Sequence, residues 1–223
     1  NIDAVSGATV TTKGITKGAN AALCAARLGA DAVLLARIGG DAYGKELTGI
    51  FEKESVDTRF LFADSEKKTA LAQIFREPDG NNRTTFFPGA SVGLSVDNAE
   101  EAFTCYPDAL YLSNSVDPEI VYYAVGKAHE QKIPVFFDLS PVCKTLDPSS
   151  VGVCEILTAS EDAAAFYTGV APTSAENALR AAIKLSALIH SKYVVLRLFC
   201  IRRSAPRADS GARCACVRYK RCR

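Results

Sequence analysis

The sequence predicts an α/β protein with a doubly wound, mostly parallel sheet and a small β lid. Apolar strand-like runs alternate with helical stretches of about ten or more residues, an order that requires crossover connections between parallel strands. A hairpin-like segment around residues 67–91 interrupts this alternation. A basic, cysteine-rich stretch follows residue 198 and shows no hydrophobic period. We therefore expect an α/β domain over 1–198 and an aberrant, disordered tail over 199–223.

The first elements follow from spacing and stop signals. Residues 18–30, GANAALCAARLGA, have helical spacing, and Gly29 falls where a helix ends. Residues 31–39, DAVLLARIG, are a short apolar strand. Residues 43–56, YGKELTGIFEKESV, carry apolar side chains on one face of a helix.

Strand-like and helical segments alternate again after residue 108. Pro118 suits the first turn of a helix, Gly169 closes one, and Ser174 resembles a helix cap. The expected strands cover residues 109–113, 133–139, 154–159 and 192–198, and the expected helices cover 118–132, 160–169 and 173–191.

The segment KKTALAQIFREPDGNNRTTFFPGAS alternates, turns at residues 78–81 and alternates again, which predicts a β-hairpin. The stretch GATVTTKG near the start is also strand-like. We expect a small β-sheet that stands off the main body, with lid segments at about 6–14 and 58–92. A lid over a cleft and an oligomer surface are two uses, and one does not exclude the other.

Composition narrows the function. The chain has 223 residues, 48% of them hydrophobic, and no apolar run of the roughly 18–20 residues that cross a bilayer. No secretory leader is recognisable, so we expect a cytoplasmic protein without a membrane partner. Residues 1–196 carry 17 basic and 24 acidic side chains, which argues against nucleic-acid binding. We expect buried, reduced thiols at Cys24, Cys105, Cys143 and Cys154.

One constellation indicates a polar ligand. Gly18 and Asn20 begin a helix, where backbone N–H groups are free, and Asp41 follows a strand at the edge where open α/β sheets bind ligands. A carboxylate and an amide there would hold sugar hydroxyls. The alternative is that the glycines serve turns and Asp41 caps the next helix.

The same stretch resembles the PfkB-type, ribokinase-like carbohydrate kinases. The family pattern Gly-Gly-Lys-Gly-Ala-Asn, Leu-Gly, Gly-x-Asp-x-x-Gly is matched here by residues 17–20, 28–29 and 39–44. Ile15-Thr16 replaces the Gly-Gly pair. DGNNRTTFFPGAS resembles the family's lid hairpin, IPVFFDLSP its central strand, and ILTASEDAAAFYTG its Pro-Asn-Glu-x-Glu element. The resemblance covers about residues 6–198.

The resemblance implies a sugar kinase that transfers phosphate from ATP, with Mg²⁺, to a hydroxymethyl group of a sugar or sugar acid. It also implies a homodimer formed through the β lid. Arg83 in the lid suits an anionic substrate, and a solvated turn residue is the alternative. Which sugar is bound does not follow from these residues. By resemblance, the substrate-binding residues are Lys17, Gly18, Asn20, Gly40, Asp41 and Arg83.

The nucleotide half departs from the family pattern. Ser160 replaces Asn and Ala163 replaces Glu in the Asn-x-x-Glu element, which leaves Ser160 and Glu161 as the candidate residues for ATP. We assign no metal ligand, because Ala163 has no side-chain oxygen.

In the family, residues beyond the strand expected at 192–198 supply the adenine pocket and a Gly-Ala-Gly-Asp element with the anion hole and the catalytic Asp. No Gly-x-Gly-Asp follows residue 198, so the resemblance implies a domain that is incomplete at its carboxyl end, and we assign no catalytic base. We expect little or no kinase activity from this chain. The alternatives are a non-catalytic sugar-binding or dimerising remnant, and a nucleoside kinase of the same fold.

The last residues have three interpretations. Residues 197–223 hold nine of the 26 Lys and Arg side chains, one acid, and four of the eight cysteines. A reading-frame change near Leu198 is one explanation, zinc binding by Cys200, Cys214, Cys216 and Cys222 a second, and a disordered basic tail a third. The resemblance implies further strands beyond residue 198. Without them the sheet would have an apolar strand edge, which we expect this tail not to cover.

Overall fold

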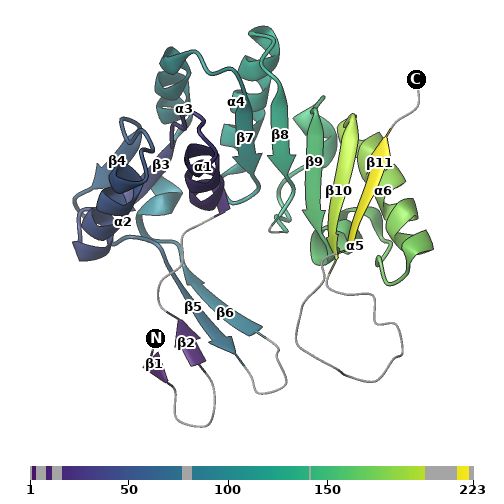
Figure 1. Ribbon diagram of the computed structural model, residues 1–223, viewed down its shortest axis with the longest axis horizontal. Coiled ribbons are helices and arrows are strands. Elements are labelled where there is room, and N and C mark those ends of the chain that lie inside the picture. Colours follow the sequence, from purple (N-terminus) through teal and green to yellow (C-terminus); the bar gives the residue numbers. More distant parts are fainter. Residues whose placement is uncertain are drawn as a thin grey trace. The chain divides into compact units, whose positions relative to one another are not determined.

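The computed structural model describes residues 2–3, 9–11, 17–76, 82–140, 142–198 and 215–220. The chain divides into two compact units, Asn1–Thr104 and Cys105–Arg223. They are called the amino-terminal and carboxyl-terminal units, and each is described by itself. Figure 1 gives the element labels.

A five-stranded sheet forms the centre of the carboxyl-terminal unit. Its strand order is β11-β10-β9-β8-β7 (Figure 1), and the four strands β7 to β10 run parallel. The predicted α/β class with a mostly parallel sheet is confirmed. The strands are β7 (Leu110–Ser113), β8 (Val135–Asp138), β9 (Ile156–Ser160), β10 (Tyr193–Leu198) and β11 (Ala215–Lys220).

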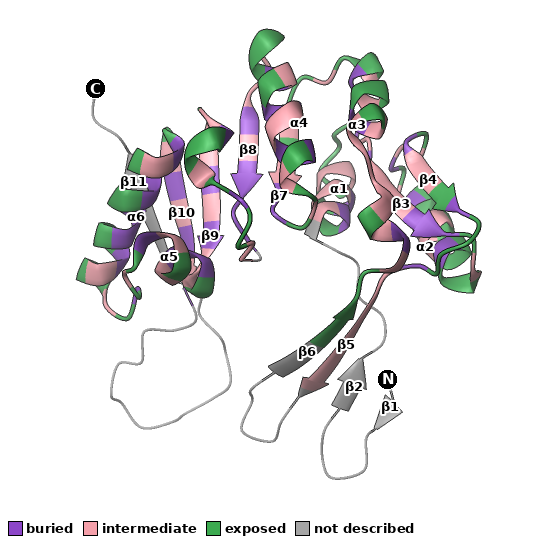
Figure 2. Ribbon diagram, turned by 180° about the vertical axis from the view of Figure 1, so that it is seen from behind, coloured by how far each residue is buried: buried purple, intermediate pink, exposed green. Residues whose placement is uncertain are grey.

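Three helices and a 3₁₀ segment connect these strands, close to the predicted positions. Pro118 lies in the first turn of its helix, Gly169 adopts the left-handed conformation that ends a helix, and Ser174 accepts a hydrogen bond from a backbone N–H as a helix cap. Alternate residues of β10 are buried (Figure 2). The helical elements are α4 (Pro118–Glu130), α5 (Glu161–Thr168), α6 (Ala175–Ile189) and η3 (Pro148–Val151).

The tail contains one strand that the sequence reading missed. Strand β11 pairs antiparallel with β10 along all six of its residues. The expectations of a tail without regular structure and of an uncovered β10 edge are therefore wrong for Ala215–Lys220. The alternation ACVRYK has the period of a strand, and sheet pairing uses backbone groups that every residue here carries. Residues 199–214 and 221–223 lie outside the described part.

In its described residues, the amino-terminal unit combines three α-helices with a short parallel sheet. Strands β3 (Ala36–Gly39) and β4 (Leu61–Asp64) pair in parallel. Helices α1 (Lys17–Arg27) and α2 (Ala42–Lys53) share a core of Ala19, Leu23, Leu34, Phe51 and Val56. Further along lie a 3₁₀ segment η1 (Gly89–Gly93), helix α3 (Val96–Ala102) and a short 3₁₀ turn η2 (Phe103–Cys105).

A second, antiparallel sheet belongs to the same unit. Its order is β1-β2-β5-β6, with β1 (Ile2–Asp3), β2 (Thr9–Thr11), β5 (Leu71–Arg76) and β6 (Asn82–Phe87). This confirms the predicted small β-sheet and its hairpin, although the turn at 78–81 lies outside the described residues. The expected lid segment 58–92 begins too early, because Leu61–Asp64 pairs with β3 instead.

The four cysteines whose side chains are described are free thiols, as expected. Their predicted burial is right for Cys154 but wrong for Cys24, which is exposed on α1. Cys105 and Cys143 are half-buried. Within the described residues, no helix combines the length and apolar character that a membrane span requires.

Candidate functional site

Asp41 lies where β3 ends and α2 begins, and its carboxylate accepts three hydrogen bonds. Oδ1 accepts one from the Gly44 N–H at 3.0 Å and one from the Thr69 hydroxyl at 2.6 Å. Oδ2 accepts one from the Thr69 N–H at 3.1 Å. The interpretation of Asp41 as a helix cap is confirmed, while sugar binding by Asp41 stays a prediction.

These contacts favour the ionised carboxylate. The pKa of Asp41 is lowered, first by the Thr69 hydroxyl and then by the Gly44 N–H, and the charge of Lys68 adds a smaller effect. The side chain is half-buried. Oδ2 accepts one hydrogen bond, from the Thr69 N–H, so it retains acceptor capacity for a further donor.

The candidate residues of α1 occupy its first turn. Gly18 is half-buried and Asn20 is exposed, and Lys17 begins the helix with its side chain outside the described part. A side chain at Gly18 would meet nothing within 4 Å, so sterics in this structure do not require glycine there. Room beside Gly18 is compatible with a ligand, since N–H groups in the first turn of a helix have no acceptor within the helix itself.

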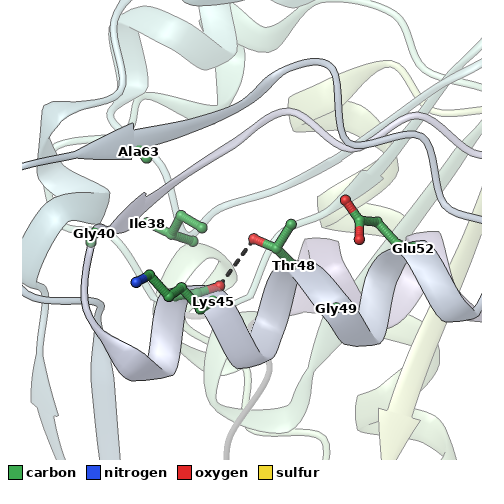
Figure 3. Close-up of a pocket in the computed structure, with 9 residues that line it drawn as sticks. Ile38, Gly40, Lys45, Thr48, Gly49, Glu52 and Ala63 are labelled. Atoms are coloured by element: carbon green, nitrogen blue, oxygen red, sulfur yellow. Dashed lines mark hydrogen bonds between the residues drawn. The ribbon is translucent and has the colours of Figure 1, made fainter.

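A pocket of about 340 Å³ lies between α2 and the strands β3 and β4 (Figure 3). Of the predicted residues, only Gly40 lines it. The Thr48 hydroxyl donates to the Gly44 carbonyl at 3.0 Å, so its proton is already engaged. The remaining walls combine the charged side chains of Lys45 and Glu52 with apolar residues such as Ile38. The structure thus does not gather the predicted sugar ligands into this pocket.

Arg83 belongs to β6, opposite Phe75 of β5. Its side chain lies outside the described part, so its predicted contact with an anionic substrate stays a prediction.

A second polar cluster lies at the carboxyl ends of the strands in the carboxyl-terminal unit. Asp138 is 2% exposed, and both of its oxygens accept bonds from Nη2 of Arg197, at 2.8 and 3.1 Å. The same nitrogen donates to the Ser140 hydroxyl at 3.1 Å, which in turn donates to that of Ser160 at 3.1 Å. Burial, and then the charge of Asp138, raise the pKa of Tyr111. An ion pair therefore occupies the carboxyl ends of these strands.

The described residues do not fit a Mg²⁺ ion held by the Asn-x-x-Glu element. The Ser160 hydroxyl accepts from the Ala163 N–H at 3.3 Å and caps α5. Ala163 is fully buried and has no oxygen in its side chain. Glu161 alone supplies a carboxylate at its matched position, whereas Mg²⁺ needs an octahedral set of oxygens. Among the described residues, no cluster of three or more His, Cys, Asp or Glu side chains forms a metal site.

Sequence reasoning missed Thr69, Arg37 and the Arg197–Asp138 pair. Arg37 donates to the Gly93 carbonyl at 2.9 Å and to Asp64 at 3.2 Å. Thr69 and Arg37 are single polar residues beside strands, and no local pattern marks them. Arg197 carries a signal, because a charge interrupts the apolar run YVVLRL.

Comparison with known proteins places these observations in a family. A family model described as pfkB family carbohydrate kinase matches residues 17–198, and one described as FMN-binding domain matches residues 1–24. The first match begins directly after Ile15-Thr16, where the Gly-Gly pair is absent. The FMN-binding match falls mostly outside the described residues.

Ribokinases are among the similar proteins. The chain is 30% identical over 168 residues to ribokinase from Haemophilus influenzae, covering 74% of this chain and 55% of that protein. It is 26% identical over 171 residues to mouse ribokinase, covering 76% and 53%. A solved structure of Arabidopsis thaliana ribokinase complexed with ribose and ATP superposes with a TM-score of 0.68 at 23% identity, covering 81% of this chain and 59% of that chain.

The similarity to solved structures shows that the chain has a ribokinase-like α/β fold. The family match extends over most of the chain, which therefore belongs to the pfkB family of carbohydrate kinases. The chain spans about half the length of the curated relatives it matches.

Proposed function

We propose that this chain provides the sugar-binding part of an ATP-dependent carbohydrate kinase. The observation that carries the proposal is the pfkB match over residues 17–198, which includes the helix start at Gly18 and Asn20 and the strand end at Gly40 and Asp41. In this reaction a protein mainly positions the acceptor hydroxyl and stabilises charge.

The amino-terminal unit supplies the groups that would hold the sugar. The remaining acceptor capacity of Asp41 Oδ2 suits a sugar hydroxyl, and the Asn20 side chain is exposed at the start of α1. Lys17 and Arg83 add positive charge in sequence positions that match the family and favour a sugar acid or a phosphorylated sugar.

We also propose that the 223-residue polypeptide alone transfers little phosphate. Ser160 is occupied as a helix cap and Ala163 is a buried methyl group, so α5 offers the nucleotide fewer oxygen ligands than the family pattern. Glu161 and the positive end of the α5 helix dipole are the groups left to meet ATP, and the carboxylate opposes a triphosphate. Mg²⁺ would therefore arrive on the nucleotide and not from this element.

Titration calorimetry with ribose, fructose and 2-keto-3-deoxygluconate tests the sugar site. We expect one of these sugars to bind, and Asp41→Asn to weaken it about tenfold, because the charge-assisted hydrogen bond is lost while Asn still caps a helix. Asp31→Asn, an exposed carboxyl in the same unit, is the matched control. Absence of heat with every sugar would count against this proposal. Displacement of the sugar by adenosine would also count against it and would favour a nucleoside kinase.

A coupled ADP-release assay with ATP, Mg²⁺ and the bound sugar tests the second statement. Turnover by the 223-residue polypeptide at a rate typical of kinases, roughly 1–100 s⁻¹, would refute it.

A homodimer through the small sheet is a further proposal, supported by one feature of β6. Phe86 and Phe87 on this strand are 53% and 49% exposed, and β6 lies at one side of the sheet order β1-β2-β5-β6. Two exposed aromatic side chains on an edge strand favour association of this sheet with the same sheet of a second copy of the chain. Light scattering after size-exclusion chromatography tests it: a monomer at all concentrations, or a dimer unchanged in Phe86→Lys, would exclude this surface.

A further inference from the structure

The loop that leads into hairpin β5–β6 is seated directly on the glycine-and-aspartate motif 39–44. The Thr69 hydroxyl accepts from the Gly39 N–H at 3.0 Å and donates to Asp41 at 2.6 Å, and the Thr69 N–H donates to the other oxygen of Asp41. Thr69 is 8% exposed and stands two residues before β5. We call Gly39, Asp41, Gly44 and Thr69 the hairpin seat.

The glycines of the motif are required by this close approach. A β-carbon at Gly39 would overlap the backbone of residues 67–69, and one at Gly44 would overlap the carbonyl of Gly39. Three backbone segments therefore converge within van der Waals distance: the end of β3, the first turn of α2 and the loop before β5. The spacing Gly-x-Asp-x-x-Gly is explained here by the seating of the loop.

The other strand of the hairpin is anchored to the same loop. Gly89, two residues after β6, has a positive φ of 51°, and a β-carbon there would overlap the Lys68 carbonyl. That carbonyl accepts the Ala90 N–H at 2.8 Å. Both ends of the hairpin thus depend on residues 68–69, and Thr69 is joined by hydrogen bonds to the candidate sugar carboxylate.

We infer that Thr69 is a positioning residue that couples sugar binding at Asp41 to the hairpin β5–β6. This inference rests on the proposed sugar site. The proposed sugar site and the base of the hairpin share one carboxylate. Thr69 donates to both oxygens of Asp41, and Oδ2 can accept a further hydrogen bond from a sugar hydroxyl. A sugar hydroxyl at Oδ2 reorients the carboxylate that holds the base of the hairpin, so occupancy of the site alters how firmly the hairpin is held.

The coupling has a required reciprocal. If a sugar steadies the hairpin by some factor through Thr69, removing Thr69 must weaken sugar binding by the same factor. One net hydrogen bond corresponds to about fivefold. If Thr69 had only a structural role, its substitution would change the stability of the protein, and the effects on sugar affinity and on the hairpin would not be linked.

Hydrogen–deuterium exchange of the β5 and β6 amides, measured with and without saturating sugar, tests the inference on the full 223-residue chain. In the unsubstituted chain we expect sugar to slow exchange about fivefold. In Thr69→Val the slowing is lost and the sugar binds about fivefold more weakly by calorimetry. Thr69→Ser keeps the hydroxyl and should restore both. Thr48→Val, which removes a hydroxyl bonded to a carbonyl in the same unit, is the control and should change neither.

Sugar-induced slowing in Thr69→Val equal to that of the unsubstituted chain would overturn the inference. If no sugar binds any variant, the proposed function fails. The contacts of the hairpin seat are then tested in the sugar-free protein. Thr69→Val and Asp41→Asn should then each speed β5–β6 exchange relative to Thr48→Val, and the ¹³C titration of the Asp41 carboxyl should move to higher pH in Thr69→Val and return in Thr69→Ser. Unchanged exchange and titration would refute the seat, even with a folded protein.

Discussion

Two aspartates at strand ends, Asp41 in the amino-terminal unit and Asp138 in the carboxyl-terminal unit, are used in opposite ways. Asp41 is half-buried and held by neutral donors, the Thr69 hydroxyl and backbone N–H groups. Asp138 is 2% exposed and held by the Arg197 guanidinium. Replacing a neutral hydrogen-bond donor with a substrate hydroxyl costs little free energy, because one neutral donor takes the place of another. A buried carboxylate that loses its cationic partner keeps a negative charge that nothing neutralises, which costs much more.

The comparison indicates where each unit can respond to a ligand. The amino-terminal unit joins its carboxylate to a hairpin base through replaceable hydrogen bonds. The carboxyl-terminal unit uses its carboxylate in an ion pair that also engages Ser140 and, through it, Ser160. We therefore expect ligand-linked change at Asp41 and mainly stability effects at Asp138.

The largest effect is expected from breaking the buried pair. Arg197→Met should lower the free energy of unfolding by about 2–3 kcal/mol, which is less than the roughly 3–5 kcal/mol of a fully buried pair because the Arg197 side chain is 42% exposed. Urea denaturation monitored by circular dichroism measures it.

The matched control is Lys192→Met, which removes a pair with Glu155 whose side chains are 56% and 42% exposed. It should cost less than about 1 kcal/mol. Equal losses in the two variants would mean that Asp138 is not committed to Arg197, and the contrast between the two aspartates would fail.

The next effect tests the packing of the hairpin seat. Gly44→Ala should destabilise the protein by about 1–3 kcal/mol, since the added methyl group overlaps the Gly39 carbonyl and forces a backbone shift. Gly49→Ala, in the same helix with nothing within 4 Å of the new methyl group, should instead stabilise it by about 0.5–1 kcal/mol. Thermal denaturation of both variants gives the sign directly. A neutral Gly44→Ala would contradict the close approach.

The class of fold and most helices follow from local signals, and the reasons are visible in particular residues. Pro118, Gly169 and Ser174 mark helix ends by backbone geometry that is encoded locally. Strand β11 was missed although ACVRYK alternates, because its basic composition obscured the period. The pairing of β4 with β3 is set by the backbone of another segment, so residues 58–64 alone do not reveal it.

The candidate site was predictable only in part. Asp41 follows from the motif spacing, and its capping role from its place before α2. Its partner Thr69 is 28 residues away, and no periodicity links the two. The Arg197–Asp138 contact spans 59 residues and depends on the order of β8, β9 and β10 in the sheet. Contacts of this kind are fixed by tertiary pairing, which local propensity does not encode.

A smaller effect concerns the pH dependence of stability. The pKa of Asp41 in the folded state is lowered, chiefly by the Thr69 hydroxyl, so the carboxylate stabilises the fold above its unfolded pKa of about 4. This contribution is lost as the pH falls from that value toward the folded pKa. In Thr69→Val the folded pKa is closer to the unfolded one, so less stability should be lost on acidification.

Urea denaturation at pH 7 and near pH 3 measures this difference in both proteins. Asp57, Asp64 and Asp147 also have lowered pKa values, but they are common to both proteins and cancel in the comparison. A steeper acid loss in Thr69→Val would mean that the Thr69 hydroxyl does not stabilise the ionised form.

The smallest effect on the fold is expected from thiol modification. The reagent is uncharged, and it compares the accessibility of one cysteine in each unit. Cys24 is exposed on α1, whereas Cys154 is 2% exposed and burial raises its pKa to about 12. Iodoacetamide reacts with the thiolate, so at pH 8 Cys24 should be alkylated without unfolding while Cys154 stays unmodified until urea exposes it. Peptide mapping by mass spectrometry distinguishes the two sites. Rapid alkylation of Cys154 in the native protein would show that the carboxyl-terminal core opens readily, and the contrast between the two units would then fail.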